Sequence, residues 1–305
     1  MKIMVYEARP DEQADLEKQA ALHGVELSVT DAVPTLENAS LAAGCAGVSI
    51  LGQGRIDAAL LDAYHALGIR YLSTRTIGYD HIDLGHARSI GLRVCSASYA
   101  PNGVADFTVM MILMCLRHYK QALWRGQVND FSLTGLQGRE MKDLTIGIIG
   151  TGRIGAQVVR NLSGFGCRIL AYDLRRNPAV EPQVTYVDFD TLLAQSDVIT
   201  LHMPLLDSNR HIINREAIAK MRDGVVIVNC SRGELADIEA LIEGIETGKI
   251  GALGMDTVEG DEGIIHADHR VDILPNRNWF YLHQFRNVIM TQHMAFYTDA
   301  AVASM

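Results

Sequence analysis

The sequence predicts an α/β protein with two doubly wound parallel-sheet domains, and three observations support this prediction. Short apolar segments typical of strands alternate with amphipathic helical patterns along most of the chain. A glycine-rich turn at residues 150–155 separates one such strand from the next helix, and the first hundred residues contain no turn of this kind. The length of 305 residues also suggests about two domains.

The composition is that of an ordinary globular protein, with 48% hydrophobic and 21% charged residues. The net charge of −9 and the lack of a Lys/Arg cluster argue against a nucleic-acid partner. Five cysteines occur without a CxxC pair, which favours free thiols in a reducing cytoplasm. The N-terminus resembles a strand instead of a signal peptide, and the most apolar stretch, residues 109–116, is too short to cross a membrane. We therefore expect a cytoplasmic protein with no membrane partner and no metal site.

The first part of the chain has strands expected at residues 3–6, 25–29, 47–51, 69–72 and 92–94. The helices expected between them are residues 10–24, 58–67 and 81–90, the second of them capped by Asp57. This pattern predicts an open parallel sheet with helices on both faces. Because no phosphate-binding turn occurs here, we interpret residues 1–100 as a separate, flavodoxin-like substrate domain, to which residues 296–305 return.

A long helix is expected from Pro101 to about Gly126. Proline suits the first turn of a helix, where its missing N–H is not needed. Met and Leu lie on most sides of this helix, so we expect it to be buried, at the junction of the two domains. Residues 101–295 are assigned to the second domain.

The glycine-rich turn has the sequence context of a dinucleotide-binding fold. The turn follows a strand expected at residues 144–149 and precedes a helix expected at residues 154–165. A second strand is expected at residues 168–172. Gly150 allows a tight turn, Gly152 allows the backbone to approach a pyrophosphate, and Gly155 allows the helix to pack closely on the strand. The helix N-terminus also presents free N–H groups to the phosphates. The second domain is therefore predicted to be a Rossmann domain.

Asp173 ends the second of these strands and governs the predicted choice of cofactor. Its carboxylate is placed to accept hydrogen bonds from the adenosine ribose and would repel a 2′-phosphate. The sequence therefore favours NAD over NADP. Arg175 and Arg176 lie just beyond Asp173 and leave NADP as the alternative.

The second domain continues with strands expected at residues 184–187, 197–202, 224–229, 251–255 and 288–291. Helices are expected at residues 215–221, with Asn214 as the cap, and at residues 238–247. Residues 258–285 are expected to be irregular, and a long irregular segment is often functional.

Polar side chains follow the last three of these strands, at Arg232, at an acidic group and at His293. Ligands of doubly wound sheets bind outside the carboxyl ends of the strands, so these side chains should converge. Arg can bind a carboxylate through two parallel hydrogen bonds, and protonated His can give a proton to a carbonyl oxygen as hydride reaches the carbon. A neighbouring carboxylate raises the pKa of such a His. The set predicts reduction of a carbonyl beside a carboxylate, with three candidates for the acidic partner, Glu259, Asp261 and Glu262.

Seven segments, in this order, resemble the D-isomer-specific 2-hydroxyacid dehydrogenases: residues 73–83, 99–102, 104–106, 150–155, 228–233, 255–257 and 293–298. Within that family the chain resembles D-lactate dehydrogenases, especially the vancomycin-resistance type. The resemblance covers almost the whole chain. It implies an NAD-dependent enzyme that reduces a 2-keto acid to the (R)-2-hydroxy acid, most simply pyruvate to D-lactate. We also expect a homodimer.

The resemblance implies roles for individual residues. Arg232 would bind the substrate carboxylate and polarise the carbonyl, and His293 would be the acid/base. On the substrate side, the backbone at Ile77 and Gly78 would hold the other carboxylate oxygen, with Tyr99 and Phe296 bordering the substrate side chain. On the cofactor side, Arg153 and Ile154 would lie at the pyrophosphate, and Met203, Pro204 and Asn209 would lie along the cofactor. Cys230, Ser231 and Asp256 would also bind the cofactor. Asp256 and the backbone at Cys230 would orient the nicotinamide carboxamide.

The sequence departs from the family pattern at two places. The family usually has Glu at the position of Asp261, which is shorter by one methylene and would reach His293 less well or through water. Glu262 is the neighbouring substitute, and Glu259 is a weaker one. The family also continues past the His motif with a helix that returns to the first domain, whereas this sequence ends at Met305, within the start of that helix.

Other functions fit the same resemblance. D-2-hydroxyisocaproate or phenyllactate dehydrogenases would need a larger pocket, and glyoxylate reduction is a further alternative. Phosphoglycerate oxidation is less favoured because the chain carries no extra regulatory domain. A different class, an NAD(H)-sensing corepressor-like protein, should lack a working Arg, acid and His set, and this chain has Arg232 and His293.

Overall fold

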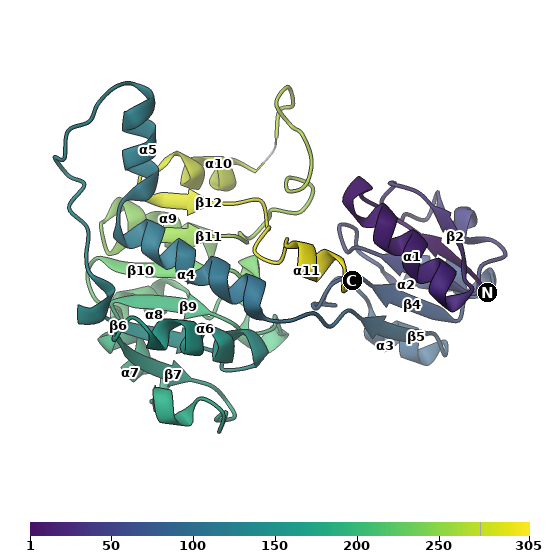
Figure 1. Ribbon diagram of the computed structural model, residues 1–305, viewed down its shortest axis with the longest axis horizontal. Helices are drawn as coiled ribbons and strands as arrows, with labels where there is room; N and C mark the ends of the chain where they lie inside the picture. Colours follow the sequence, from purple (N-terminus) through teal and green to yellow (C-terminus); the bar gives the residue numbers. More distant parts are fainter. Residues whose placement is uncertain (275) are drawn as a thin grey trace. The chain divides into compact units, whose positions relative to one another are not determined.

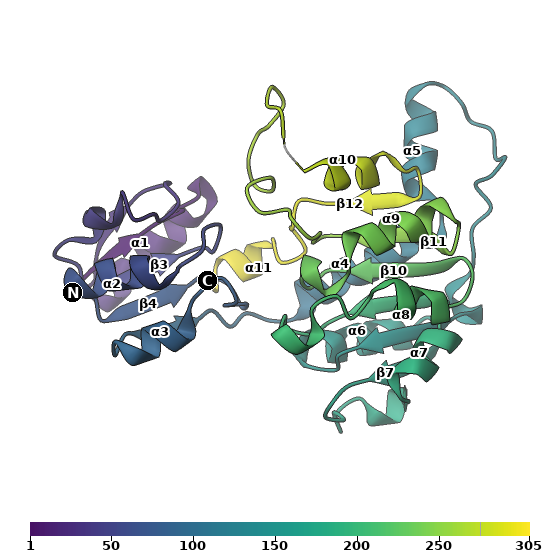
Figure 2. The same ribbon diagram turned by 180° about the vertical axis from the view of Figure 1, so that it is seen from behind.

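The computed structural model of the protein describes residues 1–274 and 276–305, which form two compact units. One unit contains Met1–Ala100 together with Tyr297–Met305, and the other contains Pro101–Phe296. Each unit has its own parallel sheet, as Figures 1 and 2 show from opposite sides. Each unit also has its own hydrophobic core. Among the described residues, no helix combines the length and the apolar character needed to cross a membrane.

The first unit is built on a five-stranded parallel sheet with the order β2-β1-β3-β4-β5. The winding reverses between β1 and β3, as it does in flavodoxin-like folds, so the predicted sheet is confirmed. Asp57 caps its helix as predicted, by accepting a hydrogen bond of 3.0 Å from the Leu60 N–H. The strands are β1 Lys2–Val5, β2 Glu26–Val29, β3 Gly47–Ile50, β4 Tyr71–Thr74 and β5 Arg93–Ser96, and the helices are α1 Gln13–His23, α2 Ala58–Ala66, α3 Leu84–Ser89 and α11 Asp299–Val302.

The second unit is built on a seven-stranded parallel sheet with the order β12-β11-β10-β9-β6-β7-β8. The winding reverses between β6 and β9, which gives the predicted Rossmann order extended by β12. The strands are β6 Thr145–Ile149, β7 Arg168–Tyr172, β8 Thr185–Tyr186, β9 Val198–Leu201, β10 Val225–Asn229, β11 Ile250–Met255 and β12 Val288–Met290. The helices are α4 Asn102–Leu116, α5 Tyr119–Gln127, α6 Arg153–Ser163, α7 Phe189–Gln195, α8 Arg215–Lys220, α9 Ile238–Glu246 and α10 Arg277–Gln284.

Helices cover both faces of this second sheet (Figures 1 and 2). In β10, Val226 and Val228 pack with α4 and α6, whereas Val225 and Ile227 pack with α8 and α9 on the opposite face. Successive side chains of a strand point to opposite faces, so a strand buried on both faces is apolar throughout. This double burial explains why β10 has no polar alternation.

The predicted helix from Pro101 to Gly126 is wrong as a single element, because the chain forms α4 and α5 with a break between them. His118 at the break has φ +51, a left-handed conformation that a helix cannot continue through. Residues of α4 are buried as predicted, but in α5 only Gln121 is buried and Trp124 is 66% exposed. Apolar composition alone did not reveal that the chain turns at His118 and that α5 extends from the sheet layers (Figure 1).

Two other helices correct the sequence-based description. The segment 258–285, expected to be irregular throughout, ends in α10. Asn276 begins this helix by accepting a hydrogen bond of 3.0 Å from the Trp279 N–H, and Leu282 is buried on the sheet. Helix α7 was not predicted; Asp188 caps it by accepting the Thr191 N–H at 2.8 Å.

Candidate active site

The turn between β6 and α6 requires glycine at two positions and leaves open space at a third. Gly150 has φ +94, and a Cβ there would lie 2.6 Å from the carbonyl oxygen of His202. A Cβ on Gly155 would lie 1.9 Å from the carbonyl oxygen of Gly150, so helix and turn touch through backbone alone. A Cβ on Gly152 would meet no atom within 4 Å, and Gly152 directly precedes the 11-residue α6. This open cradle at a helix N-terminus suits a pyrophosphate.

Asp173 lies at the end of β7 and supports the glycine-rich turn. Its carboxylate accepts hydrogen bonds from the N–H and hydroxyl of Thr151 at 2.6 and 3.1 Å, and from the Arg175 N–H at 2.9 Å. The Tyr186 hydroxyl donates to the Thr151 hydroxyl at 2.9 Å, and the Asn177 amide donates to the Thr151 carbonyl at 2.8 Å. These bonds orient Asp173 toward the turn. Tyr186 and Asn177 are 35 and 26 positions from Thr151 in the sequence, so the sequence analysis missed their hydrogen bonds to it.

Five of the predicted cofactor residues lie in the connected loops that follow β9 and β10: Met203, Pro204, Asn209, Cys230 and Ser231. Asn209 donates to the carbonyl of Pro204 and accepts the Leu206 N–H, both at 2.8 Å, and so closes the first loop. The Ser231 hydroxyl donates to the carbonyl of Met203 at 2.6 Å. This last bond joins the end of β9 to the end of β10.

Two titratable groups, His202 after β9 and Cys230 after β10, have pKa values that burial shifts. Burial lowers the pKa of His202 to about 3, so its imidazole is neutral near pH 7. Its Nε2 lies 3.1 Å from the Thr200 hydroxyl. Burial also raises the pKa of the Cys230 thiol, with the nearby Asp256 carboxylate adding to the rise. Both groups are therefore uncharged at neutral pH.

The side chain of Asn229 shapes the turn that carries Arg232. Asn229 is wholly buried; its amide donates to the Arg232 carbonyl at 2.7 Å, and its oxygen accepts the Ser231 N–H at 3.0 Å. The Arg232 guanidinium donates to the Ser231 carbonyl at 2.9 Å. At the next residue, a Cβ on Gly233 would lie 2.3 Å from the backbone of Val258. The turns after β10 and β11 are therefore in direct backbone contact.

Asp256 follows β11 and holds the segment that contains His293. Its two oxygens accept hydrogen bonds from the Thr291 hydroxyl at 2.6 Å, the Met294 N–H at 2.9 Å and the Ala295 N–H at 2.8 Å. Asp256 is 1% exposed, so these bonds compensate for the burial of its carboxylate. His293 itself has φ +52, a left-handed conformation that is unfavourable for a residue other than glycine. Asp256 thus positions His293, a task that the sequence analysis did not foresee.

Asp261 and Glu262 differ sharply in environment. The Asp261 carboxylate accepts the Val258 N–H at 3.1 Å and is half-buried, whereas Glu262 is exposed. Burial raises the pKa of Asp261 to about 6, and the neighbouring carboxylates of Glu234, Glu262 and Asp256 add to the rise. A carboxyl group with this pKa titrates within the working range of a His.

Glu259 is engaged elsewhere. One of its oxygens lies 2.6 Å from Nε2 of His211 and 3.4 Å from the guanidinium of Arg210. The other accepts the Ile238 N–H, at 3.5 Å, at the start of α9. Glu259 is therefore paired with His211 and Arg210, and its rank below Asp261 and Glu262 as the acidic partner stays a prediction.

The rings of His266 and Phe296 form a cluster of three with the ring of His293. The Phe296 ring meets the His293 ring edge-on, with 6.3 Å between centroids. The His266 ring lies 6.1 Å from His293 and 6.4 Å from Phe296. His266 comes from the irregular segment after Asp261, and no spacing in the sequence pointed to it.

The other predicted substrate residues belong to the first unit. Gly78 accepts a hydrogen bond of 2.6 Å at its carbonyl from the Thr76 hydroxyl, and the Thr74 and Thr76 hydroxyls lie 2.6 Å apart. Ile77 is half-buried, and Tyr99 is buried. Thr74 is the last residue of β4, and Ile77, Gly78 and Tyr99 follow β4 and β5 at the carboxyl edge of the sheet.

A buried carboxylate that the sequence analysis missed organises the same edge. Glu7, at the end of β1, accepts hydrogen bonds from three successive N–H groups, those of Leu51, Gly52 and Gln53. The buried guanidinium of Arg75 donates to the Glu7 carbonyl at 3.1 Å. The loop after β3 is therefore tied to the end of β1.

Comparisons of the sequence with known proteins find a matching family and similar dehydrogenases and reductases. Residues 109–295 match the family described as D-isomer specific 2-hydroxyacid dehydrogenase, NAD binding domain. An aromatic 2-oxoacid reductase of Clostridium sporogenes is 41% identical over the whole chain and 93% of the relative. A D-lactate dehydrogenase of Lactobacillus delbrueckii subsp. bulgaricus is 39% identical, covering the whole chain and 92% of the relative.

Solved structures extend the similarity to the fold. The pyruvate reductase of Chlamydomonas reinhardtii superposes with a TM-score of 0.89 at 34% identity, covering 99% of this chain and 92% of the other. The apo-structure of D-lactate dehydrogenase from Escherichia coli gives a TM-score of 0.87 at 36% identity, covering 100% and 93%. The cradle at Gly152, the two parallel sheets and these similarities lead to one conclusion: the chain belongs to the NAD-dependent D-isomer-specific 2-hydroxyacid dehydrogenases.

Proposed function

We propose that the protein reduces a small 2-keto acid, pyruvate first of all, to the (R)-2-hydroxy acid at a site that contains Arg232, Asp261 and His293. The observation that supports this most directly is the direct linkage of three strand ends. Gly233, next to Arg232, packs on the backbone of Val258, and Asp256 binds the segment around His293. A cationic fork, a titratable carboxyl and an imidazole are the groups that this reduction needs.

The residues at the Rossmann turn fit the cofactor. Gly150, Gly152, Arg153, Ile154 and Gly155 would hold the pyrophosphate, since Gly152 borders open space at the start of α6. Asp173 would bind the adenosine ribose. The loops at Met203, Pro204 and Asn209, and at Cys230, Ser231 and Asp256, would flank the rest of the dinucleotide. When bound, NADH supplies the hydride.

The protein groups would bind the substrate and move one proton. Arg232 holds the substrate carboxylate with two parallel N–H donors and polarises the keto group. A ring N–H of His293 gives its proton to the keto oxygen, and the Asp261 carboxylate favours the imidazolium form of His293. By the family resemblance, the backbone at Ile77 and Gly78 in the first unit, the proposed substrate domain, would hold the second carboxylate oxygen. Tyr99 and Phe296 would border the substrate side chain.

The test of this proposal is a comparison of substrates and of two arginine variants. We expect NADH oxidation with pyruvate, 2-ketoisocaproate and phenylpyruvate, with the highest kcat/KM for pyruvate. Arg232→Lys keeps the charge but loses the planar fork, so kcat should fall and KM for the keto acid should rise, with little change in NADH affinity. Arg210→Lys, in an exposed arginine paired with Glu259, is the matched control. Normal turnover of Arg232→Lys would remove Arg232 from the site.

A second candidate is the reduction of aromatic 2-keto acids. The relative that carries the name aromatic 2-oxoacid reductase is 41% identical to this chain, covering all of this chain and 93% of the relative. Two aromatic side chains, Tyr99 and Phe296, would border the substrate side chain. A preference for phenylpyruvate over pyruvate in the same panel would favour this candidate, and the roles of Arg232 and His293 would be unchanged.

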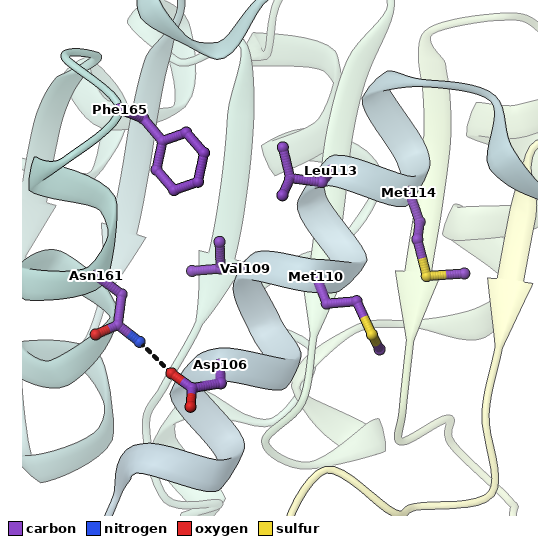
Figure 3. Close-up of a pocket in the computed structure, with 7 residues that line it drawn as sticks. All are labelled: Asp106, Val109, Met110, Leu113, Met114, Asn161 and Phe165. Carbon is purple, nitrogen blue, oxygen red and sulfur yellow. Dashed lines mark hydrogen bonds between the residues drawn. The ribbon is translucent and has the colours of Figure 1, made fainter.

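We further propose that the protein is a cytoplasmic homodimer. The α5 region exposes a run of large apolar side chains: Leu123, Trp124, Val128, Phe131 and Leu133. Helices α4 and α6 also border a surface hollow of about 570 Å³, lined by Asp106, Val109, Met110, Leu113, Met114, Asn161 and Phe165 (Figure 3). Exposed apolar surface of this kind is typical of protein interfaces. Free cysteines fit a reducing compartment.

A further inference from the structure

His266 lies in the irregular segment between β11 and α10, within hydrogen-bond reach of the backbone of His293. Its Nε2 is 3.2 Å from the His293 carbonyl oxygen. A carbonyl oxygen only accepts hydrogen bonds, so Nε2 of His266 carries the hydrogen. The bond therefore exists in the neutral Nε2–H tautomer and in the imidazolium, and it does not depend on the charge of His266.

This bond acts on a backbone segment that is conformationally strained. His293 has φ +52, and His266 has φ +63; both values are in the left-handed region. Residues other than glycine keep such values only where their surroundings hold them. Asp256 holds the residues after His293 by accepting the Met294 and Ala295 N–H groups. His266 holds the carbonyl of His293 itself, from a different segment of the chain.

The segment that presents His266 is itself anchored at two places. The Ile264 N–H donates to the Asp261 carbonyl at 3.0 Å, which forms the turn before His266. The Asn276 amide donates to the Gly260 carbonyl at 2.8 Å and links the far end of the segment to its beginning. These two bonds help to hold His266 next to His293. The His266 ring also faces the Phe296 ring edge-on.

We propose that His266 is a positioning residue that fixes the orientation of His293 through the His293 carbonyl. The inference rests on the proposed acid/base role of His293. Loss of the bond frees the His293 backbone to rotate, so the ring N–H is aimed less often at the keto oxygen. Small misplacements of a reacting group cost large factors in rate, so the effect belongs to kcat and leaves substrate binding largely intact.

Three substitutions separate the hydrogen bond from the packing of the ring. His266→Gln retains a side-chain N–H donor, His266→Phe retains an aromatic ring without a donor, and His266→Ala removes both without adding bulk. The matched control is His269→Gln, because His269 lies in the same segment but contacts Asp272, at 2.8 Å. Each variant is characterised by kcat, by KM for pyruvate and NADH, by melting temperature, and by the isotope effect with NADH deuterated at the transferred position.

We expect His266→Phe and His266→Ala to lower kcat roughly tenfold, with KM for pyruvate changed less than about twofold and an increased isotope effect. His266→Gln should remain within about threefold of the wild type, and His269→Gln should match the wild type. Equal losses in His266→Gln and His266→Phe would overturn the proposal, as would normal kcat in His266→Ala. A kcat loss that follows the melting temperature without an increased isotope effect would also overturn it.

A parallel measurement on His293→Gln distinguishes a failure of the proposed acid/base role of His293 from a failure of the positioning role of His266. If His293→Gln keeps its turnover, the acid/base role of His293 fails and the inference about His266 fails with it. If His293→Gln is inactive while His266→Ala turns over normally, the proposed function stands and only the positioning role is overturned.

Discussion

Three carboxylates near the end of β11 show how the surroundings give one functional group different tasks. Asp256 is buried and accepts three hydrogen bonds from the segment around His293. Glu259 pairs with His211 and Arg210. Asp261 is half-buried with a pKa raised to about 6, so it is the carboxyl group that can change charge near the working pH. The three residues lie within six positions of one another, and only their contacts separate them.

The titration of Asp261 leads to a prediction about pH. Reduction requires protonated His293, so kcat/KM for the keto acid should fall as the pH rises through the His293 pKa, and oxidation of the hydroxy acid should show the opposite trend. A charged Asp261 favours the imidazolium, so Asp261→Asn should shift both profiles to lower pH. Below about pH 6 the wild-type carboxyl is itself protonated, so the difference between the two enzymes should shrink there.

The measurement is kcat/KM in both directions from about pH 5 to about pH 9, under conditions in which chemistry limits the rate. Glu262→Gln is the control, because Glu262 is exposed and should shift the profiles little. Superimposable profiles for the wild type and Asp261→Asn would show that Asp261 is not the partner of His293. A shift in Glu262→Gln alone would identify Glu262 instead.

At the scale of elements, the β6–α6 turn contains glycines with different physical roles. Gly155→Ala would place its Cβ 1.9 Å from the Gly150 carbonyl oxygen, which is backbone and cannot move aside cheaply. We expect destabilisation of about 1–3 kcal/mol or more and a lower melting temperature. Gly152→Ala meets no atom within 4 Å, so the melting temperature should stay near that of the wild type.

The two variants should differ in cofactor binding as well. The added methyl group of Gly152→Ala would occupy the space proposed for the pyrophosphate, so KM for NADH should rise roughly tenfold while the fold is retained. Differential scanning fluorimetry and NADH titrations provide the two readouts. An unchanged NADH affinity in Gly152→Ala would place the pyrophosphate elsewhere, and a stable Gly155→Ala would contradict the close packing of α6.

At the scale of the whole molecule, the exposed apolar residues of the α5 region lead to a prediction about assembly. Trp124 and Phe131 are 66% and 78% exposed, which is costly for a monomer in water. We expect the wild type to sediment as a dimer and the combined variant Trp124→Ser, Phe131→Ser to sediment as a monomer. Leu22→Ser, at a residue 71% exposed in α1, is the control and should remain dimeric. A monomeric wild type, or a dimeric combined variant, would contradict an interface at α5.

The sequence by itself determined the features that depend on neighbouring residues. The strands appear as short apolar segments, and the Asp57 and Asn214 caps act on N–H groups three residues away. The Gly150–Gly155 contact also lies within one turn. Such interactions are local, so residue type and spacing are enough to predict them. The order of motifs was specific enough to predict the family and both sheets.

Only the tertiary structure decided how the candidate site is held together. The Ala295 N–H donates to Asp256, 39 positions away, and the His266 ring donates to the His293 carbonyl, 27 positions away. The Gly52 N–H donates to the Glu7 carboxylate, 45 positions away. The break at His118 and the exposure of α5 likewise depend on where the chain packs. Composition and periodicity do not encode such separations, because they arise only when distant loops are brought to the same edge of a sheet.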